Sequence, residues 1–288
     1  MQVINICKNI GGIEIQKLTP LQIKEHINAE FARGIKANSI GTQMAIFKCA
    51  MRKAEEWQII TKNPCEYIKL PKRTEPKNAI YSPEQVEKLL LTAKSTNLYL
   101  PCVLGFLCGL RRGEICGLRW QDIDIETKTA DIQHSFDRNP LTKTLELGKV
   151  KTMASKSRIV LSDIVIIALK QEQLQQKEYQ LKNGPNYKNL DFTWAHSDGS
   201  PYLPDYLYAA FIKLLKKAGL PVIRPHDMRH TFATLLWESG LDDKSISAAA
   251  RHAKTSFTSD YYVHLRQTAK NRPAAAIDSM FKRKLEKD

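Results

Sequence analysis

Residues 98–124 of this 288-residue chain read LYLPCVLGFLCGLRRGEICGLRWQDID. The part from Leu98 to Leu110 is uncharged and apolar over 13 residues, and it ends at Arg111-Arg112. A membrane span needs roughly 20 apolar residues, so this stretch predicts a helix buried in a protein core. An arginine at the end of such a helix can present its donors to an oxyanion, with Glu114 holding it in place. The alternative for this cluster alone is a surface ion pair.

The composition indicates a globular protein with an affinity for polyanions. The chain has 44 Lys+Arg against 30 Asp+Glu, a net charge of +14, and 43% hydrophobic residues. That hydrophobic content excludes a disordered chain, and the positive charge favours nucleic acid as a partner. The N-terminus lacks the pattern of a signal peptide, and the six cysteines fall singly, without a CxxC pair. We therefore expect a soluble cytoplasmic protein with reduced thiols, with neither a disulfide framework nor a zinc site.

The chain divides into two predicted modules. Residues 1–72 form a helical module whose start is incomplete, residues 73–78 form a linker, and residues 79–288 form the larger module. Each module opens with a capped helix, because Thr19-Pro20-Leu21-Gln22 and Ser82-Pro83-Glu84-Gln85 both combine an N-cap residue, a proline and a glutamine three positions later. In the first module a second helix carries an apolar stripe on one face: Ile40, Met44, Phe47, Met51 and Ala54.

The second module reads as mainly helical with a small antiparallel sheet, an α+β arrangement. Residues 130–134 alternate between apolar and polar, and residues 157–161 are rich in β-branched and apolar side chains. We expect a turn at residues 137–140 between the two strands. The glutamine-rich run at residues 170–182 predicts a solvated helix.

A second cluster, His226-Asp227-Met228-Arg229-His230, places His226 and Arg229 on one helix face. His226 and His230 are four residues apart, as in half of a metalloprotease motif. A metal site would need a third ligand, and an arginine inside it would oppose a cation. We therefore favour an anion site built from histidine and arginine. Farther along, Tyr261-Tyr262 is either a packing pair or, after two anion-binding clusters, the source of a nucleophile.

These clusters together resemble the tyrosine recombinases, the phage-type integrases. Four segments carry the resemblance in the order found in that family: GLRRGEICGLRWQDID at 109–124, KTMASKSRIVLS at 151–162, HDMRHTFAT at 226–234 and ARHAKTSFTSDYYVHL at 250–265. Residues 11–72 are similar to the helical core-type DNA-binding domain of integrases. The arm-type domain and most of the first core-binding helix of a full-length integrase are not matched, so we expect an N-terminally short form, whether truncated or natural.

The resemblance implies a role for each matching residue. The catalytic set would be Arg111, Lys151, His226, Arg229, His252 and the nucleophile Tyr262, with Tyr261 as its rival and Glu114 as an accessory acid. Two arginines would clamp the oxygens of a phosphodiester while Tyr262 attacks the phosphorus. The tyrosine ester would conserve the bond energy, and the arginines would neutralise charge. The resemblance therefore implies neither ATP, nor a metal ion, nor any other cofactor.

The implied function is a metal- and ATP-independent integrase that cuts and rejoins DNA, integrating or excising a phage or conjugative element. Its partner would be double-stranded DNA at attachment sites, on which the protein would form a tetramer in the cytoplasm, at the nucleoid. The C-terminal helix, residues 274–287, would dock onto a neighbouring protomer. An excisionase and DNA-bending accessory proteins are further partners that the family suggests, and no membrane is involved.

Two other functions remain open from the sequence. The family usually has Leu-Gly before its last histidine, and this chain has Ala250-Arg251. That departure leaves room for a DNA-binding protein of the same fold that cuts poorly or not at all. A type IB topoisomerase uses the same chemistry and is the other alternative. The DNA site, the preference for integration or excision, and the residues that read bases are not specified by the sequence.

Overall fold

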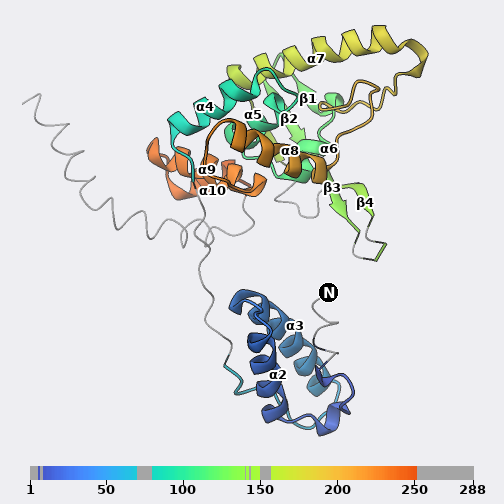
Figure 1. The fold of residues 1–288 in the computed structure, drawn as a ribbon, viewed down its shortest axis with the longest axis vertical. Helices are drawn as coiled ribbons and strands as arrows, with labels where there is room; N and C mark the ends of the chain where they lie inside the picture. The colour runs from blue at the N-terminus through green and yellow to red at the C-terminus, as the bar shows by residue number, and fades with distance from the viewer. Residues whose placement is uncertain are drawn as a thin grey trace, which may run out of the picture. The chain divides into compact units, whose positions relative to one another are not determined.

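The computed structural model describes residue 6 and residues 9–69, 80–139, 141–142, 144–149 and 157–251. It divides into two compact units, Met1–Lys77 and Asn78–Asp288 (Figure 1). The predicted linker, residues 73–78, lies outside the described residues, as do Lys151 and everything after Arg251.

The first unit is built around two helices, α2 (Pro20–Ala32) and α3 (Ala37–Glu56), preceded by a 3-10 turn at Ile15–Lys17. The predicted cap of α2 is confirmed. The backbone N–H of Gln22 donates to Thr19 Oγ1 at 3.4 Å, and the backbone N–H of Thr19 donates to Gln22 Oε1 at 2.9 Å. The predicted stripe on α3 faces the core, where four of its five members are buried and Phe47 is partly buried.

The second unit contains seven described α-helices. They are α4 (Pro83–Ala93), α5 (Tyr99–Leu107), α6 (Arg112–Gly117), α7 (Asp163–Asn183), α8 (Pro204–Lys217), α9 (Pro225–Glu238) and α10 (Asp243–Ala249). The capping box at Ser82 and Gln85 begins α4 as predicted. Helix α10 packs against α9, and α8 packs against α4 and α9 (Figure 1).

Helix α5 is the central helix of the second unit, as its apolar sequence predicts. It contacts α4, α6, α7 and α9, and Cys102, Val103 and Phe106 are fully buried. The predicted end at Leu110 is wrong, because α5 stops at Leu107 and the backbone of Gly109 takes a φ of +62°. None of the helices in the described ranges is long and apolar enough to cross a membrane.

The predicted antiparallel sheet is present, together with a second one that the sequence did not reveal. Strands β1 (Ile123–Asp124), β2 (Thr129–Ile132) and β5 (Ser157–Val160) form a three-stranded sheet in the order β1-β2-β5. Strands β3 (His134–Arg138) and β4 (Leu145–Lys149) form a separate hairpin, in which β3 packs against α6 (Figure 1). The predicted turn at residues 137–140 begins too early, because Asp137 and Arg138 still pair with β4.

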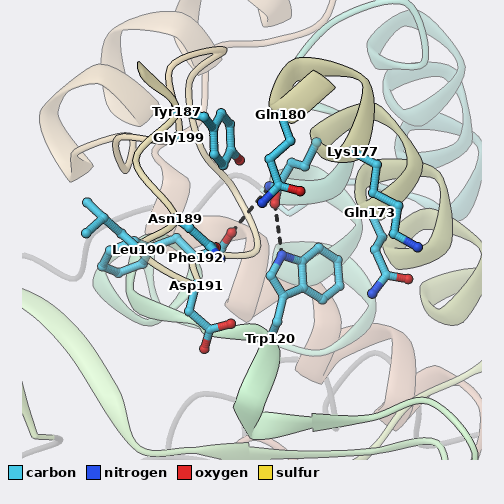
Figure 2. Close-up of a pocket in the computed structure, with 11 residues that line it drawn as sticks. Trp120, Gln173, Lys177, Gln180, Tyr187, Asn189, Leu190, Asp191, Phe192 and Gly199 are labelled. Carbon is cyan, nitrogen blue, oxygen red and sulfur yellow. Dashed lines mark hydrogen bonds between the residues drawn. The ribbon is translucent and has the colours of Figure 1, made fainter. Parts of the chain in front are cut away.

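Helix α7 is more firmly packed than its glutamine-rich sequence suggests. Gln176 is buried, accepts a hydrogen bond from Trp120 Nε1 at 2.9 Å and donates to the carbonyl of Thr193 at 3.0 Å. The first bond joins α7 to the 3-10 turn at Trp120–Asp122, and the second joins it to the loop that follows α7. Trp120 lines a pocket of about 210 Å³ between these segments (Figure 2). The prediction of a solvated helix is therefore wrong for this face of α7, where amide groups satisfy buried backbone carbonyls.

The described cysteines are free thiols. Cys65, Cys102, Cys108 and Cys116 are buried, and Cys49 is exposed. Burial raises the pKa of Cys102, of Cys108 and of Cys116 to about 12. These three thiols are therefore unreactive packing groups.

Candidate active site

The turn from α5 into α6 places Arg111 at the edge of the core. Gly109 adopts a left-handed backbone conformation, and a Cβ built on it would lie 2.5 Å from Cδ1 of Phe232 on α9. Only glycine fits both the conformation and the space. The chain then passes directly into α6, with Arg111 as the N-cap residue, whose side chain remains 35% exposed.

Glu114 holds Arg111 by two hydrogen bonds. The backbone N–H of Arg111 donates to Oε2 of Glu114 at 2.8 Å, and Nη1 of Arg111 donates to Oε1 at 2.7 Å. The Glu114 side chain is only 2% exposed. Burial raises the pKa of Glu114, but Arg251 and Arg111 outweigh that effect and hold it below its ordinary value. The carboxylate is therefore ionised and fixes the direction of the arginine.

Arg229 reaches the same place from α9. Its side chain is fully enclosed by protein, and Nη1 donates to the carbonyl oxygen of Gly109 at 2.8 Å. Within the described part of the chain, Nη2 is buried without a hydrogen-bond partner. Burial, with the nearby charges of Arg111 and Arg251, lowers the pKa of Arg229 to about 9. The guanidinium is thus still charged at neutral pH, but it is under-compensated, as expected of a group that awaits an anion.

His226 occupies the first turn of α9, one turn before Arg229. The side chain is exposed, and its ring lies edge-on to that of His230 with centroids 4.9 Å apart. Partial desolvation, together with Arg229, lowers the pKa of His226 below its ordinary value of 6.5. The imidazole is therefore neutral at pH 7 and can accept a proton.

Asp227 serves the helix and not a metal. Its Oδ2 accepts the backbone N–H of Arg224 at 2.7 Å, and its Oδ1 accepts Nη2 of Arg224 at 2.8 Å. The residue thus caps α9 and is fully engaged with Arg224. In the described ranges, histidine, cysteine and acidic side chains form no cluster of three or more that could hold a metal ion.

A third arginine joins the site from the end of α10, a position that the sequence marked only as unusual. Arg251 is buried, and its Nη2 donates to Oε2 of Glu114 at 2.7 Å. Its carbonyl oxygen accepts Nη2 of Arg111 at 3.3 Å. We call these three arginines around Glu114 the guanidinium cluster; its members are Arg111, Arg229 and Arg251. It draws on three chain segments, at residues 109–114, 229 and 251.

Comparison with known proteins supplies a family assignment. Residues 80–269 match the phage integrase family. The chain belongs to the phage integrase family. The matched region contains the entire guanidinium cluster, and the α+β fold expected from the resemblance is confirmed.

Individual relatives agree with this assignment. The chain is 28% identical over 296 residues to a XerC-like tyrosine recombinase of Caldanaerobacter subterraneus subsp. tengcongensis, covering 96% of this chain and 75% of the relative. It is 25% identical to the ICEBs1 integrase of Bacillus subtilis, covering 93% of this chain and 72% of the relative. The fold is similar to that of the Tn1549 transposon integrase solved with a circular intermediate DNA, with a TM-score of 0.76, 24% identity, and coverage of 91% of this chain and 86% of that chain.

The described residues include half of the catalytic set expected of an integrase. Arg111 and Arg229 lie together with Glu114, and His226 lies on the same helix as Arg229. Lys151, His252, Tyr261 and Tyr262 lie outside the described residues. In sequence, Lys151 falls between β4 and β5, and His252 directly follows Arg251.

Proposed function

We propose that this integrase-family chain is a site-specific DNA recombinase that cuts and rejoins DNA through a 3′-phosphotyrosyl intermediate. The observation that carries the proposal is the convergence of Arg111 and Arg229, from segments more than a hundred residues apart, beside a buried carboxylate. An exposed guanidinium on Arg111 beside a buried, incompletely paired one on Arg229 suits a phosphodiester, whose oxygens gain negative charge when the phosphorus is attacked.

The proposed chemistry assigns each catalytic residue one task. The Tyr262 oxygen attacks the phosphorus as its proton passes to His226, the group whose lowered pKa supports a neutral base. Arg111 and Arg229 bind the phosphate oxygens, and His252 adds a further hydrogen bond. The bond from phosphorus to the 5′ oxygen breaks, and Lys151 supplies the proton to that oxygen. The reverse sequence, with a 5′ hydroxyl from another strand as nucleophile, rejoins the DNA.

No nucleotide or metal ion enters this scheme. The tyrosine ester retains the energy of the broken phosphodiester, so rejoining needs no ATP. The guanidiniums carry out the charge neutralisation that Mg²⁺ provides in other phosphoryl-transfer enzymes. Tyr261 is the alternative nucleophile, one residue earlier in the chain.

The proposed assembly is a tetramer on two paired attachment sites, with phosphate contacts from a basic surface supplying most of the affinity. The DNA complex of the Tn1549 integrase supports DNA as the partner. A lambda integrase tetramer bound to a Holliday junction, with a TM-score of 0.59, supports the multimeric form. Residues 1–72 would also bind the core site. We place the protein in the cytoplasm, at the nucleoid, where its DNA substrate lies, and an excisionase or bending protein would set the direction.

A plasmid that carries two attachment sites, taken from the junctions of the element encoding the chain, tests the function. Incubation without ATP and with EDTA should give deletion or inversion products on this plasmid and none on a plasmid without sites. Tight binding without product would favour the DNA-binding protein that no longer cuts. Relaxation of supercoils on DNA without sites would favour a topoisomerase.

A further inference from the structure

Arg251 stands out because its position has two energetic disadvantages. Its backbone φ of +52° lies in the left-handed region, which is strained for every residue that has a side chain except in special turns. Its guanidinium is also buried, with a side chain only 1% exposed. Within the described residues, Nε and Nη1 of Arg251 have no hydrogen-bond partner. A glycine would relieve the strain, and an apolar side chain would avoid the buried charge, so packing alone does not account for an arginine here.

The side chain of Arg251 bonds to Glu114, and its carbonyl oxygen bonds to Arg111. Its Nη2 takes one side of the Glu114 carboxylate, at Oε2, while Nη1 of Arg111 takes the other oxygen, Oε1. Its main-chain carbonyl receives Nη2 of Arg111. Arg251 therefore fixes Glu114, which fixes Arg111, and it also holds the Arg111 guanidinium directly through the backbone. Of the three arginines only Arg111 is substantially exposed, so the buried pair acts as its support.

The charge balance also depends on Arg251. Counting only described groups, Arg111 and Arg229 against Glu114 leave one net positive charge, and Arg251 raises the net charge to two. A phosphodiester carries one negative charge, whereas the transition state formed by an attacking oxyanion carries about two. A net charge of two therefore favours the transition state over the bound substrate, which is the condition for faster cleavage.

We propose that Arg251 is a positioning residue of the cleavage site, which fixes Arg111 through Glu114 and adds the second net positive charge that the transition state requires. This inference rests on the proposed DNA-cutting function. The sequence suggests that Arg251, in place of the usual glycine, could reduce cleavage. We infer the opposite effect, because the side chain bonds to Glu114 and forms part of the guanidinium cluster.

The chain offers a closely matched control. Lys128 also has a φ of +52°, and its Nζ forms an ion pair with Asp163 at 2.6 Å, but both side chains are exposed and lie outside the guanidinium cluster. Arg251→Met and Lys128→Met therefore each remove one positive charge from a left-handed position. Thermal unfolding of both variants separates loss of folding from loss of function.

Single-turnover cleavage of two nicked half-sites tests the proposal. One half-site carries a normal scissile phosphate, and the other carries a neutral methylphosphonate at the same position. Arg251→Met should slow cleavage of the phosphate by roughly 10- to 100-fold at saturating DNA. The same variant should slow cleavage of the methylphosphonate much less, because that transition state carries less charge. Arg251→Lys should restore part of the rate, and Lys128→Met should cleave like wild type. Equal slowing on both substrates would indicate a merely structural role and overturn the proposal, as would an unchanged rate.

A binding measurement keeps this proposal separate from the function on which it rests. The Tyr262→Phe variant should bind DNA but not cut it. In this variant, we compare the affinity for a half-site with a normal phosphate with the affinity for a half-site with a methylphosphonate. The ratio of the two affinities measures how strongly the site favours the phosphate charge. Adding Arg251→Met should reduce this preference several-fold. A preference that does not change overturns the role of Arg251 even if the wild type cuts, whereas a wild type that never cuts refutes only the proposed function.

Discussion

Nη1 of Arg229 donates a hydrogen bond of 2.8 Å to the carbonyl oxygen of Gly109, 120 positions earlier in the chain. This bond joins α9 to the turn that carries Arg111, and it does so in a place where Gly109 leaves just enough room for Phe232. Arg229 is thus held by the turn that carries Arg111, so a substitution within that turn should disturb the placement of both arginines.

Replacing Gly109 should be more damaging than replacing another left-handed glycine. Gly109→Ala introduces both backbone strain and a clash with the Phe232 ring, so we expect a loss of about 2–4 kcal/mol in unfolding free energy. Gly240 has a φ of +93°, and no atom lies within 4 Å of the point that a Cβ would occupy, so Gly240→Ala should lose only about 1–2 kcal/mol. Urea unfolding of the two variants measures the difference. Equal losses would mean that the contact with Phe232 is unimportant.

Arg229→Met should separate stability from function. Removing a buried charge that is only partly paired should leave the unfolding free energy unchanged or raise it by about 1–3 kcal/mol. DNA cleavage should nevertheless fall by at least about 100-fold, because a fixed donor to the phosphate is lost. Thermal unfolding and single-turnover cleavage measure the two effects. A variant that is both unstable and inactive would contradict the description of Arg229 as an under-compensated cation.

Glu114→Gln should destabilise the second unit strongly. The neutral amide leaves Arg251 buried without its carboxylate and weakens the hold on Arg111, so we expect a loss of about 3–5 kcal/mol. Asp131→Asn is a suitable control, since Asp131 pairs with a largely exposed Arg158 and should lose less than about 1 kcal/mol. Denaturant unfolding provides the comparison, and similar small losses in both variants would argue against a buried ionic cluster.

The stability of the second unit should depend on pH through His230. Burial, with the neighbouring His226, lowers the pKa of His230 from 6.5 to about 4. Between these values the unfolded chain binds a proton that the folded chain does not, so this group lowers stability as the pH falls from 6.5 to 4, by roughly 3 kcal/mol in all. His230→Gln should remove that loss.

The half-buried carboxylate of Glu172 opposes this effect, so the pH dependence must be compared between variants. Burial raises the pKa of Glu172 to about 7, and the folded chain therefore gains a proton before the unfolded chain does as the pH falls from 7 to 4.5. Glu172 thus adds stability over much of the same range. Denaturant unfolding at pH 7, 5.5 and 4.5 should show a steeper loss in wild type than in His230→Gln. Parallel curves would exclude His230 as the titrating group.

Local sequence signals predicted the starts of α2 and α4, and the family resemblance implied that the two arginine motifs act together. The caps at Thr19 and Ser82 depend on residues three positions apart, so they are readable from sequence alone. The end of α5 was misplaced because Gly109 looks like part of an apolar helix until its contact with Phe232 is known. Strand β4 was missed because its alternation is short and includes Gly148.

Long-range pairs were the features that the sequence could not supply. Gln176 looks like a solvated residue on α7, and its hydrogen bonds with Trp120 and the carbonyl of Thr193 explain its burial. Arg251 lies 137 positions from Glu114, and no periodicity links the two. The sequence therefore shows only that Arg251 departs from the family pattern, whereas the fold places it in the guanidinium cluster.

Covalent capture of DNA tests the central claim, that this chain cuts DNA through a covalent tyrosine ester. A nicked half-site releases a short strand upon cleavage and so traps the protein–DNA ester, which a denaturing gel detects and peptide mass mapping locates. We predict an adduct on Tyr262 with wild type and Tyr261→Phe, and none with Tyr262→Phe. Loss with Tyr261→Phe alone would move the nucleophile by one residue. Tight binding by intact wild type without any adduct would contradict the account.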